Sequence, residues 1–211
     1  MSCGEKTAMR KTKMIAELVK ENRSYRRFYE DHTVEPETLK ELVSLARISA
    51  SAANLQPLKY VLSCDRRKNA EIFSCLAWAG YLKDWPGPEE GERPSAYIVV
   101  LGDTGISESA GCDHGIAAQT IMLAAREKGL AGCMLGSIDR KALRNSLNIP
   151  SQLKILLVLA IGKPKEQIVL ETIDSNDSIK YWRDNEGVHH VPKRKLEDII
   201  VAEHYCDENN T

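Results

Sequence analysis

The stretch DHGIAAQTIMLAAREKGLAGC, residues 113–133, predicts one long buried helix followed directly by a strand. Small and apolar residues cover much of the helix circumference, which is typical of a helix that packs on several sides. Gly129 is suited to end the helix, because glycine readily adopts the left-handed conformation found just past a helix C-terminus. The apolar run at residues 133–135 then indicates a buried strand, so we expect this helix at the centre of the fold.

The rest of the chain alternates between helical and strand patterns. Apolar spacing predicts helices before Asn22, after Pro36, around 72–82 and over 139–147, and apolar runs predict strands at 60–62, 96–101 and 155–161. Neither G-x-G-x-x-G nor G-x-x-x-x-G-K-[ST] occurs, so a Rossmann-like or P-loop nucleotide fold is not indicated. With few strands and a long tail after Gly162, the pattern favours an α+β fold.

The composition is that of an ordinary globular protein, with 43% hydrophobic and 28% charged residues among 211. A formal net charge of −1 gives no strong field toward nucleic acid or an anionic membrane. Six scattered cysteines without a C-x-x-C argue against a disulfide scaffold or zinc knuckle and fit a reducing compartment. Cys112 and His114 form a Cys-x-His pair, but no further ligands follow at metal-site spacing. The polar first residues lack the apolar run of a signal peptide, so we expect a cytoplasmic protein.

A basic run at residues 23–26 combines the guanidinium groups of Arg23 and Arg26 with the hydroxyl of Ser24. Arginine matches phosphate oxygens in bidentate fashion and serine adds a neutral hydrogen bond, so the run can grip a phosphate monoester. A solvated helix end has the same composition. The late stretch HHVPKRK, residues 189–195, supplies cations that either lead into a strand or complement the first run at a phosphate.

The segment SAANLQP, residues 51–57, joins small residues to two amide side chains. Small side chains let a flat ligand approach the backbone closely. Asn54 and Gln56 each offer donors and acceptors, which suits the edge of a flavin ring or ribityl hydroxyls. The same residues could equally form the polar C-terminus of a helix.

Taken together, the order and spacing of these motifs resemble the nitroreductase superfamily over nearly the whole chain. The motifs are R-S-x-R-x-F from Arg23, S-x-x-N-x-Q-P from Ser51, D-x-G-x-A-x-Q-x-x-x-L-A-A-x-x-x-G-L-x-x-C from Asp113, and V-P-K-R from Val191. The resemblance implies a nitroreductase-like α+β fold whose small, mostly antiparallel central sheet is flanked by helices. It also implies an intertwined homodimer, in which residues 1–211 form one domain and residues 163–211 are an extended tail that wraps the partner.

The resemblance further implies one FMN at each of two sites between the subunits. Arg23, Ser24 and Arg26 fall where the family holds the phosphate, and Lys193 and Arg194 match the late basic pair, although Lys195 could replace one of them. Two further groups match the flavin-binding segments of the family. The stretch that the partner lends to the flavin comprises Ala50, Ser51, Ala52, Asn54 and Gln56. The backbone that lies along the isoalloxazine ring comprises Leu135, Gly136 and Ser137.

Enzymes of this family work by ping-pong transfer, in which NADH or NADPH reduces the flavin and an oxidant then takes its place. We therefore expect an FMN-dependent oxidoreductase that reduces nitroaromatics, quinones or related small-molecule acceptors, without a metal, nucleic acid or membrane. We name no catalytic acid or base, because protons can come from solvent or from the flavin. A reductive dehalogenase, a flavin-processing enzyme and a non-catalytic FMN-binding dimer are the alternatives.

Two features leave the substrate open. Leu58 follows Pro57 where many relatives carry an aromatic residue, and the loop at 78–94 matches no known substrate pattern. Within this loop, Trp85 or Tyr81 could roof the flavin site, or Trp85 could pack against its own turn.

Overall fold

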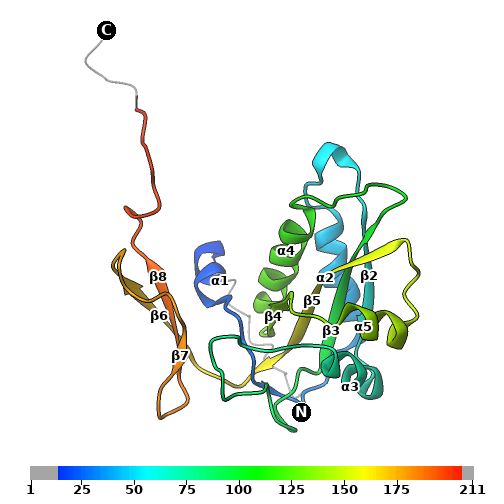
Figure 1. The fold of residues 1–211 in the computed structure, drawn as a ribbon, viewed down its shortest axis with the longest axis horizontal. Helices are drawn as coiled ribbons and strands as arrows, with labels where there is room; N and C mark the ends of the chain where they lie inside the picture. Colours follow the sequence, from blue (N-terminus) through cyan, green and yellow to red (C-terminus); the bar gives the residue numbers. More distant parts are fainter. Residues whose placement is uncertain (1–13, 206–211) are drawn as a thin grey trace, which may run out of the picture.

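The computed structural model describes residues 14–205, which form a five-stranded sheet with helices on both faces and a separate three-stranded sheet (Figure 1). The helices are α1 (Ile15–Glu21), α2 (Pro36–Arg47), α3 (Arg66–Ser74), α4 (Asp113–Glu127) and α5 (Arg140–Leu147), with the 3-10 helix η1 (Ala52–Asn54) before β2. The strands are β1 (Phe28–Tyr29), β2 (Leu58–Ser63), β3 (Ala96–Asp103), β4 (Ala131–Leu135), β5 (Leu153–Pro164), β6 (Ile168–Ile173), β7 (Trp182–Arg183) and β8 (His189–Arg194). Every pair in the larger sheet is antiparallel, so the predicted α+β fold is confirmed.

Strand β3 lies at the centre of the larger sheet, whose order is β1-β5-β3-β2, with β4 paired to β5 beside β1. Residues 96–102 are all buried, because helices cover both faces of the sheet. Ile98 and Val100 join the apolar layer beneath α2 and α4, whereas Val99 and Leu101 join the layer beneath α3 and α5. This alternation is the period of two that a strand buried on both faces requires.

Helix α4 packs closely against α2 and β4, as its small residues predict. Ala118, Ile121 and Ala125 are fully buried. Gly132 in β4 leaves no room for a side chain, because a Cβ there would meet the carbonyl oxygen of Ala160 and lie 2.7 Å from Met122 of α4. The expected central helix is therefore confirmed, and its close packing determines where β4 begins.

The helix expected around residues 72–82 is wrong in its bounds, since α3 ends at Ser74. The Asp65 carboxylate begins this helix by accepting a hydrogen bond from the backbone N–H of Lys68 at 2.8 Å. Apolar spacing does not reveal such a cap. After α3 the chain turns, and Ala79 has a φ of 40°, which a helix cannot accommodate. Residues 78–82 consequently lie on a loop.

A second small sheet follows β5, which was not predicted from the sequence although Ile168, Val169 and Leu170 form a short apolar run. Strand β6 runs parallel to β8, and β7 pairs with β8 in antiparallel fashion. His190 in β8 lies 2.7 Å from Glu171 and 3.1 Å from Asp184, and its ring stacks on Trp182 at 4.8 Å. Polar and aromatic cross-strand contacts help to hold this sheet together.

Beyond β8 the chain leaves both sheets and runs outward to residue 205 (Figure 1). Leu196, Ile199 and Val201 are exposed on this segment. That residues 163–211 wrap a second copy stays a prediction, and residues 206–211 lie outside the described part of the chain. No helix within residues 14–205 is long and apolar enough to cross a membrane.

The cysteines of the described chain carry free thiols. They are Cys64, Cys75, Cys112 and Cys133. Cys3 and Cys206 lie outside the described residues, as does the polar stretch at 1–13.

Candidate functional site

Residues 23–26 lie along the start of β4. Ser24 forms an isolated parallel bridge with Gly132, and the backbone N–H of Tyr25 donates to the Gly132 carbonyl at 2.9 Å. Arg23 folds back on α1 and donates from Nη2 to the Val19 carbonyl at 2.6 Å. Arg26 points inward and is 8% exposed. The segment is thus attached to the larger sheet by its backbone, with one arginine on each side.

Three groups surround the Arg26 guanidinium. Its Nη1 lies 3.2 Å from the Ser24 carbonyl and 3.2 Å from His189 Nε2, and its central carbon lies 4.7 Å from the centre of the Tyr181 ring. Its Nε is buried and has no hydrogen-bond partner among residues 14–205. A buried guanidinium with an unused N–H is suited to an anionic ligand.

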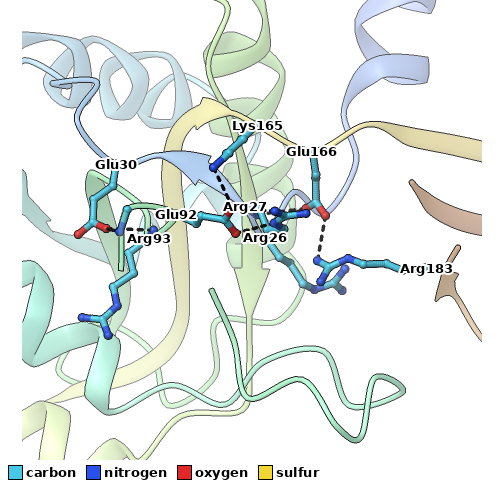
Figure 2. A network of polar contacts seen from close by, with 9 residues as sticks. Arg26, Arg27, Glu30, Glu92, Arg93, Lys165, Glu166 and Arg183 are labelled. Atoms are coloured by element: carbon cyan, nitrogen blue, oxygen red, sulfur yellow. Dashed lines mark hydrogen bonds and ion pairs between the residues drawn. The ribbon is translucent and has the colours of Figure 1, made fainter. Parts of the chain in front are cut away.

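One buried carboxylate, that of Glu166, organises this region (Figure 2). It accepts hydrogen bonds from the backbone N–H groups of Arg26 and Arg27, and it pairs with Arg183 Nη2 at 2.9 Å. Arg26 and Arg183 both contact Glu166, and we call these two residues the arginine cluster. Among the described acidic residues, Glu166 alone contacts Arg26 or Arg183, so positive charge exceeds negative charge here.

Arg27 has a different partner from Arg26. Its Nε and Nη2 donate to the two oxygens of Glu92 at 2.5 and 2.6 Å, and Lys165 Nζ lies 2.9 Å from the same carboxylate (Figure 2). The hydrogen bond from Arg27, reinforced by Lys165, lowers the pKa of Glu92 to about 2, so this carboxyl is ionised at neutral pH. Arg27 therefore ties the 78–94 loop to β1 and is not part of the arginine cluster.

His189 is neutral at physiological pH, and its tautomer follows from its neighbour. Arginine has only donors, so His189 Nε2 must accept from Arg26, and the ring proton resides on Nδ1. Burial first, and then the nearby cations Arg26 and Arg183, lowers the pKa of His189 to about 4. The lowered pKa of His189 thus reflects its burial and, after that, the positive charge of the arginine cluster.

Buried donors without partners gather around the arginine cluster. Within the described residues these are the Nε atoms of Arg26 and Arg183 and the Nδ1 of His189, and the Nε of Arg23, three residues before Arg26, is likewise buried without a partner. Burying a polar N–H without a partner is costly, so such groups usually face a ligand, an ion or water. Since all four are donors, the ligand class that fits them is an anion.

The predicted segment at residues 50–56 is anchored at the start of α4. Asp113 accepts hydrogen bonds from Ser51 Oγ at 2.6 Å and from the Ala52 backbone N–H at 3.0 Å. Asn54 and Gln56 face outward and contact each other, with Gln56 Nε2 lying 3.2 Å from Asn54 Oδ1. The segment presents its amides to the surface.

Leu135, Gly136 and Ser137 lie at the far end of β4 from Gly132. The Ser137 carbonyl accepts a hydrogen bond from the Ala77 N–H at 3.0 Å, and Gly136 and Ser137 are exposed. Three to five residues of extended chain separate this end from Gly132, which is about 10–17 Å. One strand therefore connects the arginine cluster to the second predicted segment.

Lys193 and Arg194 are not brought to Arg23 and Arg26 in this protomer. Arg194 Nη1 donates to the Ser175 carbonyl at 3.0 Å, and Lys195 pairs with Asp174. His189, four residues earlier in β8, occupies the position next to Arg26 instead. Four residues of strand correspond to about 13 Å.

Helix α4 separates the two ends of the candidate site. Asp113, which holds the 50–56 segment, begins the helix, and Arg126 near its end contacts Glu21 at 3.0 Å and the Tyr25 ring at 5.6 Å. Thirteen residues of α-helix span about 20 Å. A single protomer thus keeps the 50–56 segment and the arginine cluster apart.

The 78–94 loop packs against the tail rather than standing free. The Tyr81 ring lies 4.9 Å from that of Tyr181, and the Arg183 guanidinium lies 4.2 Å from the centre of the Trp85 ring. Tyr181 in turn covers Arg26. The loop is therefore joined to the arginine cluster through two aromatic contacts.

Several residues of this site were not predicted from the sequence. Glu166, Tyr181 and Arg183 lie on the tail, where no motif marks them, and only folding brings them to Arg26. His189 was visible solely as part of a basic stretch. Asp113 was visible as the first residue of the central helix pattern, yet nothing in that pattern indicated a contact with Ser51.

Comparison with known proteins gives a consistent set of relatives. The family model described as "Nitroreductase family" matches residues 19–163. A Bacillus subtilis protein with the provisional name NAD(P)H nitroreductase MhqN is 25% identical over 182 residues, which cover 71% of this chain and 88% of the relative. Two solved structures share the fold. A nitroreductase family protein from Streptococcus pneumoniae has a TM-score of 0.61 at 18% identity over 73% of this chain and 92% of its own. An FMN-dependent nitroreductase from Clostridium difficile has a TM-score of 0.59 at 24% identity over 72% and 89%.

We predict that the pKa values of the adjacent histidines His189 and His190 are shifted in opposite directions from the ordinary value. The lowered pKa of His189 means that its contribution to stability is present above about pH 6.5 and is lost as the pH falls toward 4. Hydrogen bonds to Glu171 and then Asp184 raise the pKa of His190, so its contribution is present below about pH 6.5 and is lost as the pH rises through the folded pKa. Nuclear magnetic resonance titration of both rings measures this. Two midpoints near pH 6.5 would contradict the arrangement around Arg26.

Proposed function

Because the chain belongs to the nitroreductase family, we propose that it is an FMN-dependent oxidoreductase that uses NADH or NADPH to reduce nitroaromatics, quinones or related acceptors by a ping-pong mechanism. The observation that carries this proposal is the arginine cluster, whose buried N–H groups lack partners among the described residues. The name of the Clostridium difficile structure, which states FMN dependence for that protein, supports the choice of cofactor.

A flavin phosphate suits the arginine cluster in charge and in hydrogen bonding. A phosphate monoester carries about −1.5 to −2 charge at neutral pH and offers only acceptors to neighbouring N–H groups. It would offset the positive charge that Glu166 leaves unbalanced and accept from Arg23, Arg26 and Ser24. Lys193 and Arg194 remain proposed contacts, which would require β8 to lie differently when the cofactor and a second copy are present.

The geometry of β4 suits the rest of an FMN molecule. From the phosphate end at Gly132, the strand leads to buried Leu135 and to Gly136 and Ser137, which are exposed, and this stretch would lie along the ring. The ribityl chain would span the intervening length of strand. In this proposal, β4 fixes both ends of the cofactor in one protomer.

We further propose that the enzyme is a homodimer in which the second copy supplies the 50–56 segment. Helix α4 keeps this segment about 20 Å from the arginine cluster of its own protomer, so a second copy is needed to bring the two together. Large apolar side chains are exposed on α1, α2, α4 and the tail, and such surfaces usually mark interfaces. They include Met14, Ile15, Val19, Leu45, Ile116, Leu196, Ile199 and Val201.

The protein's part in the reaction is binding and orientation. When bound, FMN would supply the redox chemistry itself. Arg23, Arg26 and Ser24 would anchor its phosphate, and neutral His189 would hold Arg26 in place by accepting from Nη1. The Asn54 and Gln56 amides of the second copy would face the flavin with both donors and acceptors. We assign no catalytic acid or base. The free thiols of the described chain suit a reducing compartment, so we place the enzyme in the cytoplasm.

The first test is the cofactor and its turnover. We expect the purified protein to be yellow, to release FMN on heating, and to oxidise NADH or NADPH faster when menadione is added. Chromatography of the released flavin and anaerobic NADH titration measure this. Release of FAD alone, or no flavin after reconstitution, would refute the proposal. FMN binding without menadione-dependent turnover would instead support the non-catalytic FMN-binding dimer.

Arg26→Ala tests the phosphate assignment. Loss of charge-assisted hydrogen bonds worth about 1.5–3 kcal/mol should weaken FMN binding about ten- to hundredfold. Riboflavin, which lacks the phosphate, should bind the variant and the wild type almost equally. Arg26→Lys should recover only part of the loss, because a point charge cannot reproduce the guanidinium fork.

Arg27→Ala is the matched control for this experiment. It removes the neighbouring guanidinium, whose partner is Glu92, so it should lower thermal stability while leaving FMN affinity near that of the wild type. Fluorescence titration of FMN and riboflavin into the apo proteins gives the dissociation constants. Equal FMN affinities for the Arg26 and Arg27 variants would refute the assignment of Arg26.

A complementation experiment tests the shared site. Arg26→Ala damages the phosphate end and Asn54→Ala damages the lent segment, so each homodimer should bind FMN weakly at both sites. Each proposed site combines Arg26 of one protomer with Asn54 of the other. When the two variants are co-expressed, a heterodimer should therefore have one site with both residues intact and one site with both residues changed. Purified heterodimers without a tight FMN site, or a monomer in sedimentation, would show that one protomer builds the site alone.

A further inference from the structure

The backbone between Ser51 and Pro57 is held in an uncommon conformation. Ala53, Asn54 and Gln56 have φ values of 49°, 55° and 52°, in the left-handed region that L-residues rarely adopt. Outside this loop, the non-glycine residues of the described chain with positive φ are Ala79 and Asn148. Such strain persists only where surrounding contacts determine it, and it is concentrated at ligand-binding sites.

The contacts that hold this loop converge on Asp113. Its Oδ2 accepts the hydroxyl proton of Ser51 at 2.6 Å, and its Oδ1 accepts the Ala52 N–H at 3.0 Å. Because the Ser51 proton points to Asp113, a lone pair of Ser51 Oγ is left to accept the Gln56 N–H at 2.9 Å. A chain of hydrogen bonds from Gln56 through Ser51 to Asp113 thus closes the loop around its strained residues.

Asp113 makes no ion pair among the described residues, although its side chain is buried and only 5% exposed. Its placement in the first turn of α4 stabilises a negative charge, because the helix dipole is positive at that end. Both carboxylate oxygens are used on one loop. The arrangement therefore fixes the loop to the rigid central helix and leaves the Asn54 and Gln56 side chains at the surface.

We propose that Asp113 is the positioning residue of the flavin-binding loop: its carboxylate, acting through Ser51, holds residues 51–56 in the shape that receives the flavin of a second copy. This inference rests on the proposed function, since it assumes that the loop meets a flavin. Asp113 itself contacts neither the cofactor nor the reacting atoms. It acts by making the strained loop conformation the ground state, so that binding does not have to order the loop.

The test uses Asp113→Asn, Ser51→Ala and the double variant in the full-length protein. Asparagine keeps the size of the side chain but lacks the second acceptor and the charge. Each single variant should weaken FMN binding about tenfold if the loop then adopts the binding shape only about a tenth of the time, because apparent affinity falls with the competent fraction. The double variant should be no weaker than either single one, because both changes break the same chain of contacts.

Riboflavin provides a readout that separates this role from the phosphate site. A misplaced loop should weaken riboflavin and FMN by the same factor, whereas Arg26→Ala should weaken FMN alone. Amide hydrogen exchange at Ala52 and Gln56 should accelerate in both single variants. Asp65→Asn, which also removes a carboxylate that accepts a backbone N–H near a helix start, is the matched control and should change neither flavin affinity.

The outcomes distinguish the two levels of the proposal. If the wild type binds neither flavin, the proposed function fails. If the wild type binds both and Asp113→Asn binds them equally well, the positioning role is refuted while the proposed function stands. If Asp113→Asn does not fold, Ser51→Ala decides the matter, because it removes a single oxygen atom. Unchanged affinity and unchanged hydrogen exchange in Ser51→Ala would then overturn the inference.

Discussion

The close packing of α4 on the larger sheet is the constraint on which the candidate site depends. Gly132 and the small side chains of α4 let the helix approach β4 without an intervening layer, and Met122 fills the space where a side chain at 132 would lie. This contact places the start of β4, and Ser24 and Tyr25 are bound to the Gly132 backbone. The other end of the same helix holds the 50–56 loop through Asp113. One rigid element therefore sets the distance between the two halves of the site.

Electrostatics distinguishes the two ends of α4. At the Asp113 end, a buried carboxylate is satisfied by loop donors and by the helix dipole. Near the other end, guanidinium groups outnumber the Glu166 carboxylate, and burial, together with their field, keeps His189 neutral. At this second end, buried N–H groups have no acceptor among the described residues. An anionic ligand is the simplest way to satisfy them, and this is why the proposed function begins with a phosphate.

The tail gives the site contacts that the larger sheet cannot provide. Glu166, Tyr181, Arg183 and His189 all follow β5, yet they surround Arg26, which precedes β1. The 78–94 loop joins them through Trp85 and Tyr81. A ligand bound at Arg26 would thus lie beside both the tail and this loop.

The sequence by itself determined the central helix, the buried strands and the family, because each depends on local spacing of small, apolar or basic residues. It also identified Arg23, Ser24 and Arg26 as candidate phosphate-binding residues. The bounds of α3 and the second sheet were not predicted, since a polar cap at Asp65 leaves no apolar period and the pairing of β6 with β8 joins separate stretches of the tail. Only the tertiary structure decided that Arg26 is buried beside His189, that Arg27 belongs to Glu92, and that Asp113 holds the 50–56 loop. Each of these depends on residues far apart in the chain, whose meeting is fixed by packing and charge rather than by any local pattern.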